Sequence, residues 1–278
     1  MAERPYLSII TVNLNNRLGL EKTIISVINH TLTDYEFLIF DGGSTDGSME
    51  VIAAYAHRLN YWVSEPDRGI YHAMNKGIGQ ATGEYCLFLN SGDWLIDEHV
   101  LTSIFVNVHT ADILVGDCNI SENGTVVFVA KPSAKLTLKS FVRNTIPHQS
   151  TFIKRDLFAR FGLYDESYKL HADYDFWLRT IIIGQCSVEK LNRTVADYNT
   201  AGLSSDVTNN PDIHREATEI LTGYFPPTVL DDYHHWLHEE TNELTVLRWV
   251  QRQPYLYKLI EFIYKIAKTV GKLPVDKR

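Results

Sequence analysis

Residues 36–48 read EFLIFDGGSTDGS, an apolar run that ends at Asp41 and is followed at once by glycines and small polar residues. Such a run, bounded by turn residues, predicts a buried β-strand. Three similar runs stand around it in the sequence: SIITVNL at 8–14, YWVSE at 61–65 and EYCLFLN at 84–90. Residues with helical spacing fill the stretches between these runs, so the first half alternates strand and helix. This alternation predicts an α/β fold with a mostly parallel central sheet flanked by helices.

Aspartates lie at or just after the ends of these predicted strands. Asp41 ends the second strand, and Asp93 follows the fourth. In open α/β sheets ligands bind outside the carboxyl ends of the strands, where an acid can bind ribose, a base or a metal ion. We therefore expect a nucleotide-diphosphate site at this edge of the sheet. A turn with a helix cap is the alternative for Asp46, which precedes the next predicted helix.

Composition and motifs exclude several other classes of protein. The chain has 278 residues, 45% of them hydrophobic, so it can bury a large core, and disorder is not expected. Its three cysteines lack C-x-x-C spacing, which argues against a zinc site or a disulfide framework and fits a reducing cytoplasm. We identify neither a signal peptide nor a run of about 18 apolar residues that would span a membrane. The absence of G-x-G-x-x-G and G-x-x-x-x-G-K-[ST] disfavours dinucleotide-dependent oxidoreductases and P-loop proteins.

Beyond residue 97 the pattern is less regular. We expect strands at 112–120, 125–130 and 150–154, and helices near 135–143, 155–162 and 173–183. Residues 200–215 are rich in Ser, Asn, Asp and Gly and predict a mobile loop. The expected organisation is one nucleotide-binding domain over residues 1–215 and a helical extension over residues 216–278.

The carboxyl-terminal end differs in charge from the rest of the chain. Residues 248–278 contain eight basic and two acidic residues, a net charge of +6 within a chain of net charge −8. Between residues 255 and 270 one narrow polar stripe lies on an otherwise apolar helix, formed by Lys258, Glu261, Lys265 and Lys268. A basic amphipathic helix indicates contact with an anionic surface, and packing on its own domain or on a second subunit is the alternative.

Six short motifs occur in one order along the chain. They are VNLNN at 12–16, DGGSTDGS at 41–48, SEPDRGIYHAMNKG at 64–77, LNSGDW at 89–94, PHQSTFIKRDLF at 147–158 and HADYDFWLR at 171–179. In combination they resemble the family 2 glycosyltransferases of the GT-A fold, particularly those that build bacterial surface polysaccharides. The likeness spans about residues 6–200.

This resemblance implies a nucleotide pocket over the first strands. Its residues would be Thr11, Asn13, Asp41, Asp67, Arg68 and Asn75. The carboxylates of Asp41 and Asp67 suit ribose hydroxyls or a base N–H, and Arg68 offers a planar donor fork to a carbonyl or a phosphate. The alternatives are a solvated turn for Asp67 and Arg68, and an exposed helix face for Asn75.

The resemblance also implies a metal site and departs from the family there. The family's Asp-x-Asp motif follows the fourth strand and holds a divalent ion on the donor diphosphate, whereas this chain reads Asn90-Ser91-Gly92-Asp93. Because Mg²⁺ is usually bound by one or two protein carboxylates plus substrate phosphates, Mg²⁺ or Mn²⁺ on Asp93 remains the expectation. A cap on the following helix is the alternative for Asp93.

The motif HADYDFWLR corresponds to the family's Glu-Asp-x-Asp, with Ala172 in place of the Glu. The resemblance implies that Asp173 is the general base toward the acceptor hydroxyl, with Asp175 as the other candidate. Both acids could instead cap the helix or interact with its dipole. His148 precedes a strand where the family often approaches the donor sugar or acceptor, and a satisfied structural histidine is its alternative.

A further set of histidines lies in DDYHHWLHEE, at residues 231–240. This stretch contains no H-E-x-x-H motif, so we interpret it as a solvated helix face rather than a metal site.

The expected activity is metal-dependent, inverting transfer of a sugar from a UDP- or GDP-linked donor to a hydroxyl of a glycan or a lipid-linked acceptor. The protein is expected in the cytoplasm, with possible peripheral contact at the inner face of the membrane. No nucleic-acid partner is expected, and the sequence leaves a homodimer open.

Two other classes of protein remain as alternatives. A sugar nucleotidyltransferase should carry a glycine- and lysine-rich loop after the first strand, where this chain offers only Arg17. A catalytically silent nucleotide-sugar-binding module is suggested by the changed metal motif and by Ala172.

Overall fold

The computed structural model describes residues 4–122, 124–143, 145–200, 211–239 and 249–269. It divides into two compact units, residues 1–220 and residues 221–278. The division predicted from the sequence, between residues 215 and 216, falls inside helix α8 (Pro211–Tyr224).

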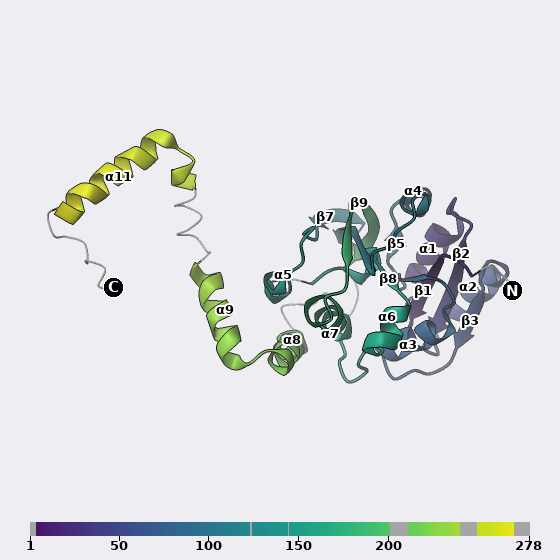
Figure 1. Ribbon diagram of the computed structural model, residues 1–278. Coiled ribbons are helices and arrows are strands. Elements are labelled where there is room, and N and C mark those ends of the chain that lie inside the picture. The colour runs from purple at the N-terminus through teal and green to yellow at the C-terminus, as the bar shows by residue number, and fades with distance from the viewer. Residues whose placement is uncertain (1–3, 123, 144, 201–210, 240–248, 270–278) are drawn as a thin grey trace. The chain divides into compact units, whose positions relative to one another are not determined.

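The first half of the chain forms the predicted parallel sheet (Figure 1). Its strands and helices are β1 (Leu7–Asn13), α1 (Arg17–Ile28), β2 (Tyr35–Asp41), α2 (Ser48–Tyr55), β3 (Tyr61–Ser64), α3 (Ile70–Gln80) and β4 (Tyr85–Phe88). Strand β1 lies between β2 and β4, β3 lies outside β2, and all three pairings are parallel. The carboxyl ends of β1, β2 and β3 therefore meet at one edge, as predicted.

Helices cover both faces of these strands. Ile9 and Phe37 are fully buried in a core cluster that also contains Leu20 of α1. Successive strand residues point to opposite faces, so Ile10 lies on the other side, against α3. A Cβ added to Gly77 of α3 would lie 2.5 Å from Ile10 Cγ2, which shows how closely this helix approaches the strand.

The second half extends the sheet with mixed strand directions. It adds β5 (Trp94–Leu95), α4 (Val100–Phe105), β6 (Ile113–Glu122), β7 (Thr125–Ala130), α5 (Leu138–Arg143), β8 (Thr151–Lys154), α6 (Asp156–Phe161), α7 (Ala172–Trp177) and β9 (Val188–Asn199). The strand order is β3-β2-β1-β4-β8-β6-β9-β5, and β7 pairs with β6. Strand β8 is antiparallel to β4 and β6, whereas β9 is parallel to β6.

Three features of the second half differ from the sequence expectations or were not predicted. Strand β9 was not predicted because charged and polar residues interrupt its sequence, VEKLNRTVADYN, and β5 is only two residues long. The predicted loop at 200–215 is wrong for residues 211–215, since Pro211 begins α8, where a missing N–H costs no helical hydrogen bond. The rest of that loop, residues 201–210, lies outside the described residues.

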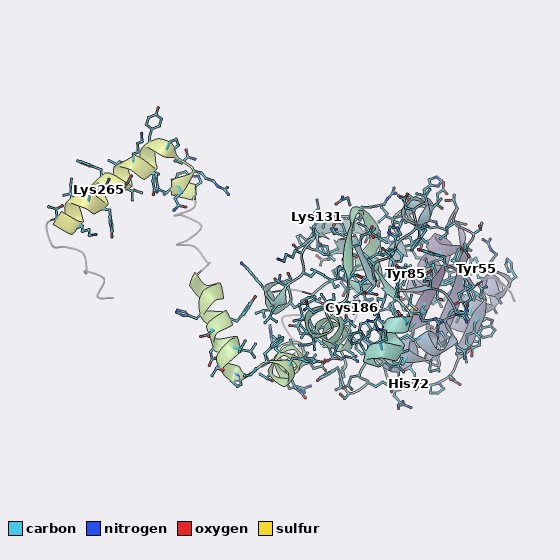
Figure 2. The ribbon with its side chains drawn as sticks, in the orientation of Figure 1. Tyr55, His72, Tyr85, Lys131, Cys186 and Lys265 are labelled. Atoms are coloured by element: carbon cyan, nitrogen blue, oxygen red, sulfur yellow. The ribbon has the colours of Figure 1, made fainter. Side chains whose placement is uncertain are left out.

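The second unit is helical in its described residues. It contains the end of α8, α9 (Pro227–Glu239) and α11 (Pro254–Thr269), so the predicted amphipathic helix forms. No residue of α11 is buried, and Figure 2 shows side chains, Lys265 among them, along its length. Among the described helices, none combines the length and apolar character needed to cross a membrane.

Candidate active site

Asp41 is the centre of a hydrogen-bonded row along the carboxyl edge of the sheet. Asn13, Asp41 and Ser64 are register partners at the ends of β1, β2 and β3. Asp41 accepts hydrogen bonds from Asn13 Nδ2 at 2.7 Å, from Ser64 Oγ at 2.5 Å and from Ser44 Oγ at 2.5 Å, and two more from the N–H groups of Gly43 and Ser44. Burial works against its charge, but the hydrogen bonds from Ser44, Ser64 and Asn13 outweigh it and lower the pKa of Asp41. Asp41 therefore stays ionised and holds three strand ends together.

The turn after β2 is tied to the turn after β1. Asn15, which has a positive φ of 49°, receives Thr45 N–H on its side-chain oxygen at 2.9 Å. Asp46 accepts the N–H of Arg17, the first residue of α1, at 2.7 Å, and that of Ser48, the first residue of α2, at 3.1 Å. Asp46 thus supplies acceptors to two helix starts, in agreement with the capping alternative.

The side chain of Asp67 lies against Gly42, the residue that follows Asp41. A Cβ added to Gly42 would lie 2.6 Å from Asp67 Oδ2, and the N–H of Gly69 donates to Asp67 Oδ1 at 2.9 Å. The loop after β3 therefore brings a second carboxylate to the edge where β2 ends. Of the six residues predicted for the nucleotide pocket, Asn13, Asp41 and Asp67 gather here.

The other three predicted pocket residues have structural partners. Thr11 is fully buried, and its hydroxyl donates to Leu89 O at 2.7 Å. Asn75 exchanges two hydrogen bonds with the backbone of Tyr164, at 2.9 and 3.0 Å, so it does not form the exposed helix face that the sequence left open. Arg68 is largely exposed and pairs with Glu166 at 2.6 Å, an ion pair of little net strength that a ligand phosphate can replace.

Asp93 lies in a loop that is fastened to α1. The Thr23 hydroxyl donates to Asp93 O at 2.6 Å and accepts the N–H of Gly92 at 3.0 Å. The Asp93 side chain is only 4% exposed, and the N–H of Asn199 donates to its Oδ1 at 3.2 Å. Burial raises the pKa of Asp93 to about 7, against the opposing effects of His148, Asn199 and Gln149. Asp93 begins the connection to β5, and Asp97 rather than Asp93 accepts the N–H of His99 before α4.

Asp197 is a carboxylate near Asp93 that the sequence did not single out. It is 6% exposed, it raises the pKa of Asp93, and its Oδ1 has no hydrogen-bond partner in the part of the chain that the structure describes. No group of three or more His, Cys, Asp or Glu side chains suited to a metal occurs among the described residues. Two buried carboxylates, one with an unpartnered oxygen, nevertheless match the hard oxygen ligands that Mg²⁺ and Mn²⁺ prefer. The donor set fits an ion that takes its remaining ligands from water and phosphate.

Asp173, at the start of α7, faces a histidine. His148 Nδ1 lies 3.2 Å from Asp173 Oδ2, while Tyr71 OH, at 3.1 Å, and the N–H of Tyr174, at 2.9 Å, donate to Oδ1. Burial opposes ionisation, but the hydrogen bond and charge of His148 outweigh it and lower the pKa of Asp173. The residue that precedes the helix is His171, and no side-chain cap bond forms there. Asp173 is therefore a buried, ionised carboxylate rather than a helix cap.

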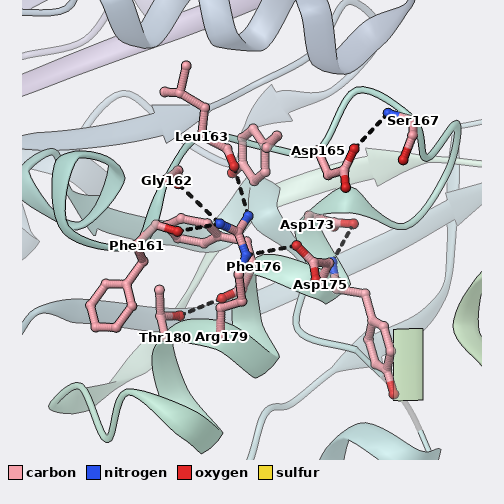
Figure 3. A network of polar contacts seen from close by, with 12 residues as sticks. Phe161, Gly162, Leu163, Asp165, Ser167, Asp173, Asp175, Phe176, Arg179 and Thr180 are labelled. Atoms are coloured by element: carbon pink, nitrogen blue, oxygen red, sulfur yellow. Dashed lines mark hydrogen bonds and ion pairs between the residues drawn. The ribbon is translucent and has the colours of Figure 1, made fainter. Parts of the chain in front are cut away.

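Asp175 has a different role. Its Oδ2 lies 2.8 Å from Nε of Arg179, whose guanidinium also donates to Phe161 O at 2.5 Å and to Leu163 O at 2.8 Å (Figure 3). This network joins α7 to the end of α6 and to the loop that follows. The geometry separates the two candidate bases, because Asp175 is committed to Arg179 whereas Asp173 is joined to His148.

The loop before α7 is held by a buried glutamate of α8. Glu216 is 1% exposed and accepts the N–H groups of Lys169 and Leu170, both at 3.0 Å. The histidine set of α9 is not testable in the same way, since the side chains of His234, His238 and Glu239 lie outside the described residues.

Comparisons with known proteins agree with this fold. The family model for glycosyl transferase family 2 matches residues 8–155. A Mycobacterium bovis protein described as a PGL/p-HBAD biosynthesis glycosyltransferase is 31% identical over 218 residues, which is 76% of this chain and 84% of the relative. A Mycobacterium tuberculosis protein described as an uncharacterized glycosyltransferase is 29% identical over 80% of this chain and 82% of the relative.

Solved structures show the same fold at lower sequence identity. Staphylococcus aureus TarS 1–349 in complex with UDP-GlcNAc has a TM-score of 0.61 and 19% identity, over 76% of this chain and 64% of that one. The match to the longer TarS structure covers only 36% of its length. The mannosyltransferase PcManGT from Pyrobaculum calidifontis, in complex with GDP-Man and Mn²⁺, has a TM-score of 0.55 and 17% identity, over 92% of this chain and 86% of that one.

Proposed function

The chain belongs to glycosyl transferase family 2, and we propose that it transfers a sugar from a nucleoside-diphosphate sugar to a hydroxyl group, with inversion at the anomeric carbon. The acceptor would be a glycan or a lipid-linked molecule, in the synthesis of a surface polysaccharide or glycolipid. The observation that carries the proposal is the set of contacts at the carboxyl ends of the strands. Asn13 binds Asp41, Asp67 lies against Gly42, and His148 links Asp173 to Asn90, three residues before Asp93. The family, the fold and this edge support one another.

The nucleotide would lie over β1, β2 and β3. Asp41 is saturated by hydrogen bonds from the protein, so we assign it to shaping the edge, and Asp67 and Asn13 to contacts with ribose or base. Arg68, exposed and paired with Glu166, would turn to a donor phosphate. Complexes of structural neighbours with UDP-GlcNAc and GDP-Man support a nucleotide-sugar donor and leave the choice of base open.

Asp93, with Asp197 beside it, would hold Mg²⁺ or Mn²⁺. When bound, such an ion supplies positive charge to the departing diphosphate. The chain's own contribution is to keep both carboxylates buried and to hold the Asp93 loop on α1 through Thr23. The Mn²⁺ complex of PcManGT supports the use of a divalent ion in this fold.

Asp173 would be the general base. An ionised carboxylate with a lowered pKa accepts the proton of the acceptor hydroxyl while that oxygen attacks the anomeric carbon. The nucleoside diphosphate leaves from the opposite face, so one displacement inverts the anomeric configuration. General-base assistance of this kind contributes about 10²–10⁴-fold to a rate.

Helix α11 supports a peripheral contact with an anionic membrane surface. It has no buried residue and it carries Lys258, Lys265 and Lys268 beside apolar and aromatic side chains. Such a helix lies in the headgroup region, where each Lys contributes about 1 kcal/mol. A cytoplasmic enzyme held there would meet a lipid-linked acceptor, and a homodimer through the same helix is the competing assignment.

A silent nucleotide-sugar-binding module is the second candidate, favoured by Asn90 and Gly92 in the metal motif and by Ala172. The deciding experiment incubates purified protein and Mn²⁺ with UDP-GlcNAc, other UDP-sugars and GDP-mannose, with a bacterial lipid extract as acceptor. We expect release of nucleoside diphosphate and a labelled lipid or glycan product, both slowed by about 10²–10⁴-fold in Asp173→Asn with donor binding retained. Donor binding without any product in the wild-type protein would favour the silent module.

A further inference from the structure

His148 joins the two sides of the candidate site. Its Nδ1 lies 3.2 Å from Asp173 Oδ2, and its Nε2 lies 3.2 Å from Asn90 Nδ2. These partners are far apart in the sequence, and they belong to the proposed base and to the loop that ends at Asp93. The His148 side chain is only 16% exposed, so both contacts are made in a largely desolvated position.

The carboxylate of Asp173 determines that Nδ1 of His148 carries a proton. An ionised carboxylate only accepts hydrogen bonds, and Nδ1 of His148 faces the Asp173 carboxylate. Nδ1 therefore carries a proton and donates it to Asp173. Nε2 lies against the Asn90 side-chain amide.

The backbone around His148 is fixed as well. Ser150 N–H and the Thr151 hydroxyl both donate to Pro147 O, at 3.2 and 2.7 Å, which closes the short 3₁₀ turn His148–Ser150 before β8. The ring is therefore presented from a rigid element. A rigid donor restricts the orientation of the carboxylate that it contacts.

We infer that His148 is a positioning residue for the transfer reaction: it orients the Asp173 carboxylate toward the acceptor hydroxyl and couples it to the Asn90–Asp93 loop on the donor side. This inference rests on the proposed function. In the step itself the acceptor O–H bond breaks and its proton goes to Asp173. The acceptor oxygen forms a bond to the anomeric carbon, and the bond from that carbon to the phosphate oxygen breaks, with the electron pair leaving on the nucleoside diphosphate. His148 keeps its proton throughout.

Three substitutions separate the two contacts of His148. His148→Asn places an amide nitrogen near the position of Nδ1 and so keeps a donor to Asp173. His148→Gln reaches the position of Nε2 and so keeps the contact with Asn90. His148→Ala removes both. The matched control is His109→Asn, because His109 is another buried histidine with Nδ1 3.1 Å from a carboxylate, Glu189.

The experiment measures nucleotide release and donor affinity for these variants, with UDP-GlcNAc or GDP-mannose as the probe, whichever the wild-type protein consumes. We expect His148→Ala and His148→Gln to lower kcat by about 10–100-fold with donor Kd changed less than about threefold, because a displaced base costs rate rather than binding. His148→Asn should recover most of the rate, and His109→Asn should leave kcat near wild type.

A double-mutant cycle shows whether His148 acts through Asp173. In the Asp173→Asn background, His148→Ala should cost less than about threefold, since the base it orients is gone. Equal losses in both backgrounds, or wild-type kcat in His148→Ala, would overturn the inference while the proposed function stands. If wild-type protein transfers no sugar, the proposed function fails and this inference falls with it.

A measurement without substrate tests the contact itself. ¹⁵N-detected NMR of the histidine ring at neutral pH should show a proton on Nδ1 of His148, with a signal that changes in Asp173→Asn. A ring protonated on Nε2 alone would contradict the assignment even in protein that is fully active.

Discussion

Arg179 Nε lies 2.8 Å from Asp175 Oδ2, and this ion pair is what distinguishes two aspartates that stand only two positions apart on one helix. Asp175 is used by the fold, and Asp173 remains for chemistry.

The first prediction follows from that difference. Asp175→Asn should lower the free energy of unfolding by about 2–3 kcal/mol, because it removes the charge that faces the largely buried Arg179, while protein that folds keeps most of its kcat. Asp173→Asn also weakens buried contacts, with His148 and Tyr71, so it should destabilise the fold as well, but unlike Asp175→Asn it should lower kcat by about 10²–10⁴-fold. Denaturant unfolding and donor-consumption kinetics on both variants check the assignment, and the opposite pattern would exchange the two roles.

The second prediction concerns pH and Asp93. Its pKa is about 7 in the folded chain, against an ordinary value of 3.8, so between these values the folded state binds one more proton than the unfolded state. Stability therefore falls as pH rises through this range, by about 4 kcal/mol for this group alone. Asp93→Asn should remove this loss and be more stable than wild type at pH 8. If the difference in melting temperature between wild type and Asp93→Asn were the same at pH 5 and at pH 8, this prediction would be wrong.

The third prediction couples the same group to a metal. Because a ligand carboxylate must lose its proton, stabilisation of the wild-type protein by Mn²⁺ should increase as pH rises through about 7. Asp93→Asn and Asp197→Asn should each reduce that stabilisation. Melting temperatures with and without Mn²⁺ between pH 5.5 and pH 8.5 give the measurement, and a metal response independent of Asp93 would place the ion elsewhere.

The fourth prediction uses two glycines. Gly42→Ala puts a Cβ 2.6 Å from Asp67 Oδ2, so the Asp67 side chain must move, and donor affinity should fall by about tenfold or more. Gly79→Ala is the control, since a Cβ there meets nothing within 4 Å and its helix should gain about 0.5–1 kcal/mol. Calorimetric titration with a nucleotide sugar compares them. Unchanged affinity in Gly42→Ala would show that Asp67 does not contact the donor.

The fifth prediction concerns α11. Replacing Lys258, Lys265 and Lys268 with Glu should weaken sedimentation with vesicles of phosphatidylcholine and phosphatidylserine by at least about tenfold. The control replaces Lys131 and Lys135, two exposed lysines of the unit formed by residues 1–220, with Glu. Equal binding of the triple variant and wild type, or a concentration-dependent dimer that the triple variant abolishes, would favour a protein partner for this helix.

The sequence was most informative where an apolar run ends in an acid. The run EFLIFD correctly placed Asp41 at the carboxyl edge of the sheet, because the local sequence shows both the strand and the residue at which it ends. Ser64 offered the same signal, since it ends the run YWVS, and its hydrogen bond to Asp41 could have been expected once the parallel order was assumed.

Residues whose role depends on distant partners were not predictable in this way. Asn75 was expected in the nucleotide pocket, with an exposed helix face as the alternative, but it binds Tyr164, 89 positions away. His148 contacts Asn90 and Asp173 from 58 and 25 positions away, and no local pattern encodes such distances. Asp197 was missed because its strand, β9, carries too many charged residues to be predicted.

The central claim is that the carboxyl edge of the sheet binds an activated sugar by its nucleotide and diphosphate. Calorimetric titration of the purified chain with a panel of UDP-, GDP- and other nucleotide sugars, each with Mn²⁺ or Mg²⁺, tests it most directly. The account predicts saturable binding of at least one donor, weakened in Asp67→Asn. Absence of binding across the whole panel, in protein shown to be folded, would contradict it.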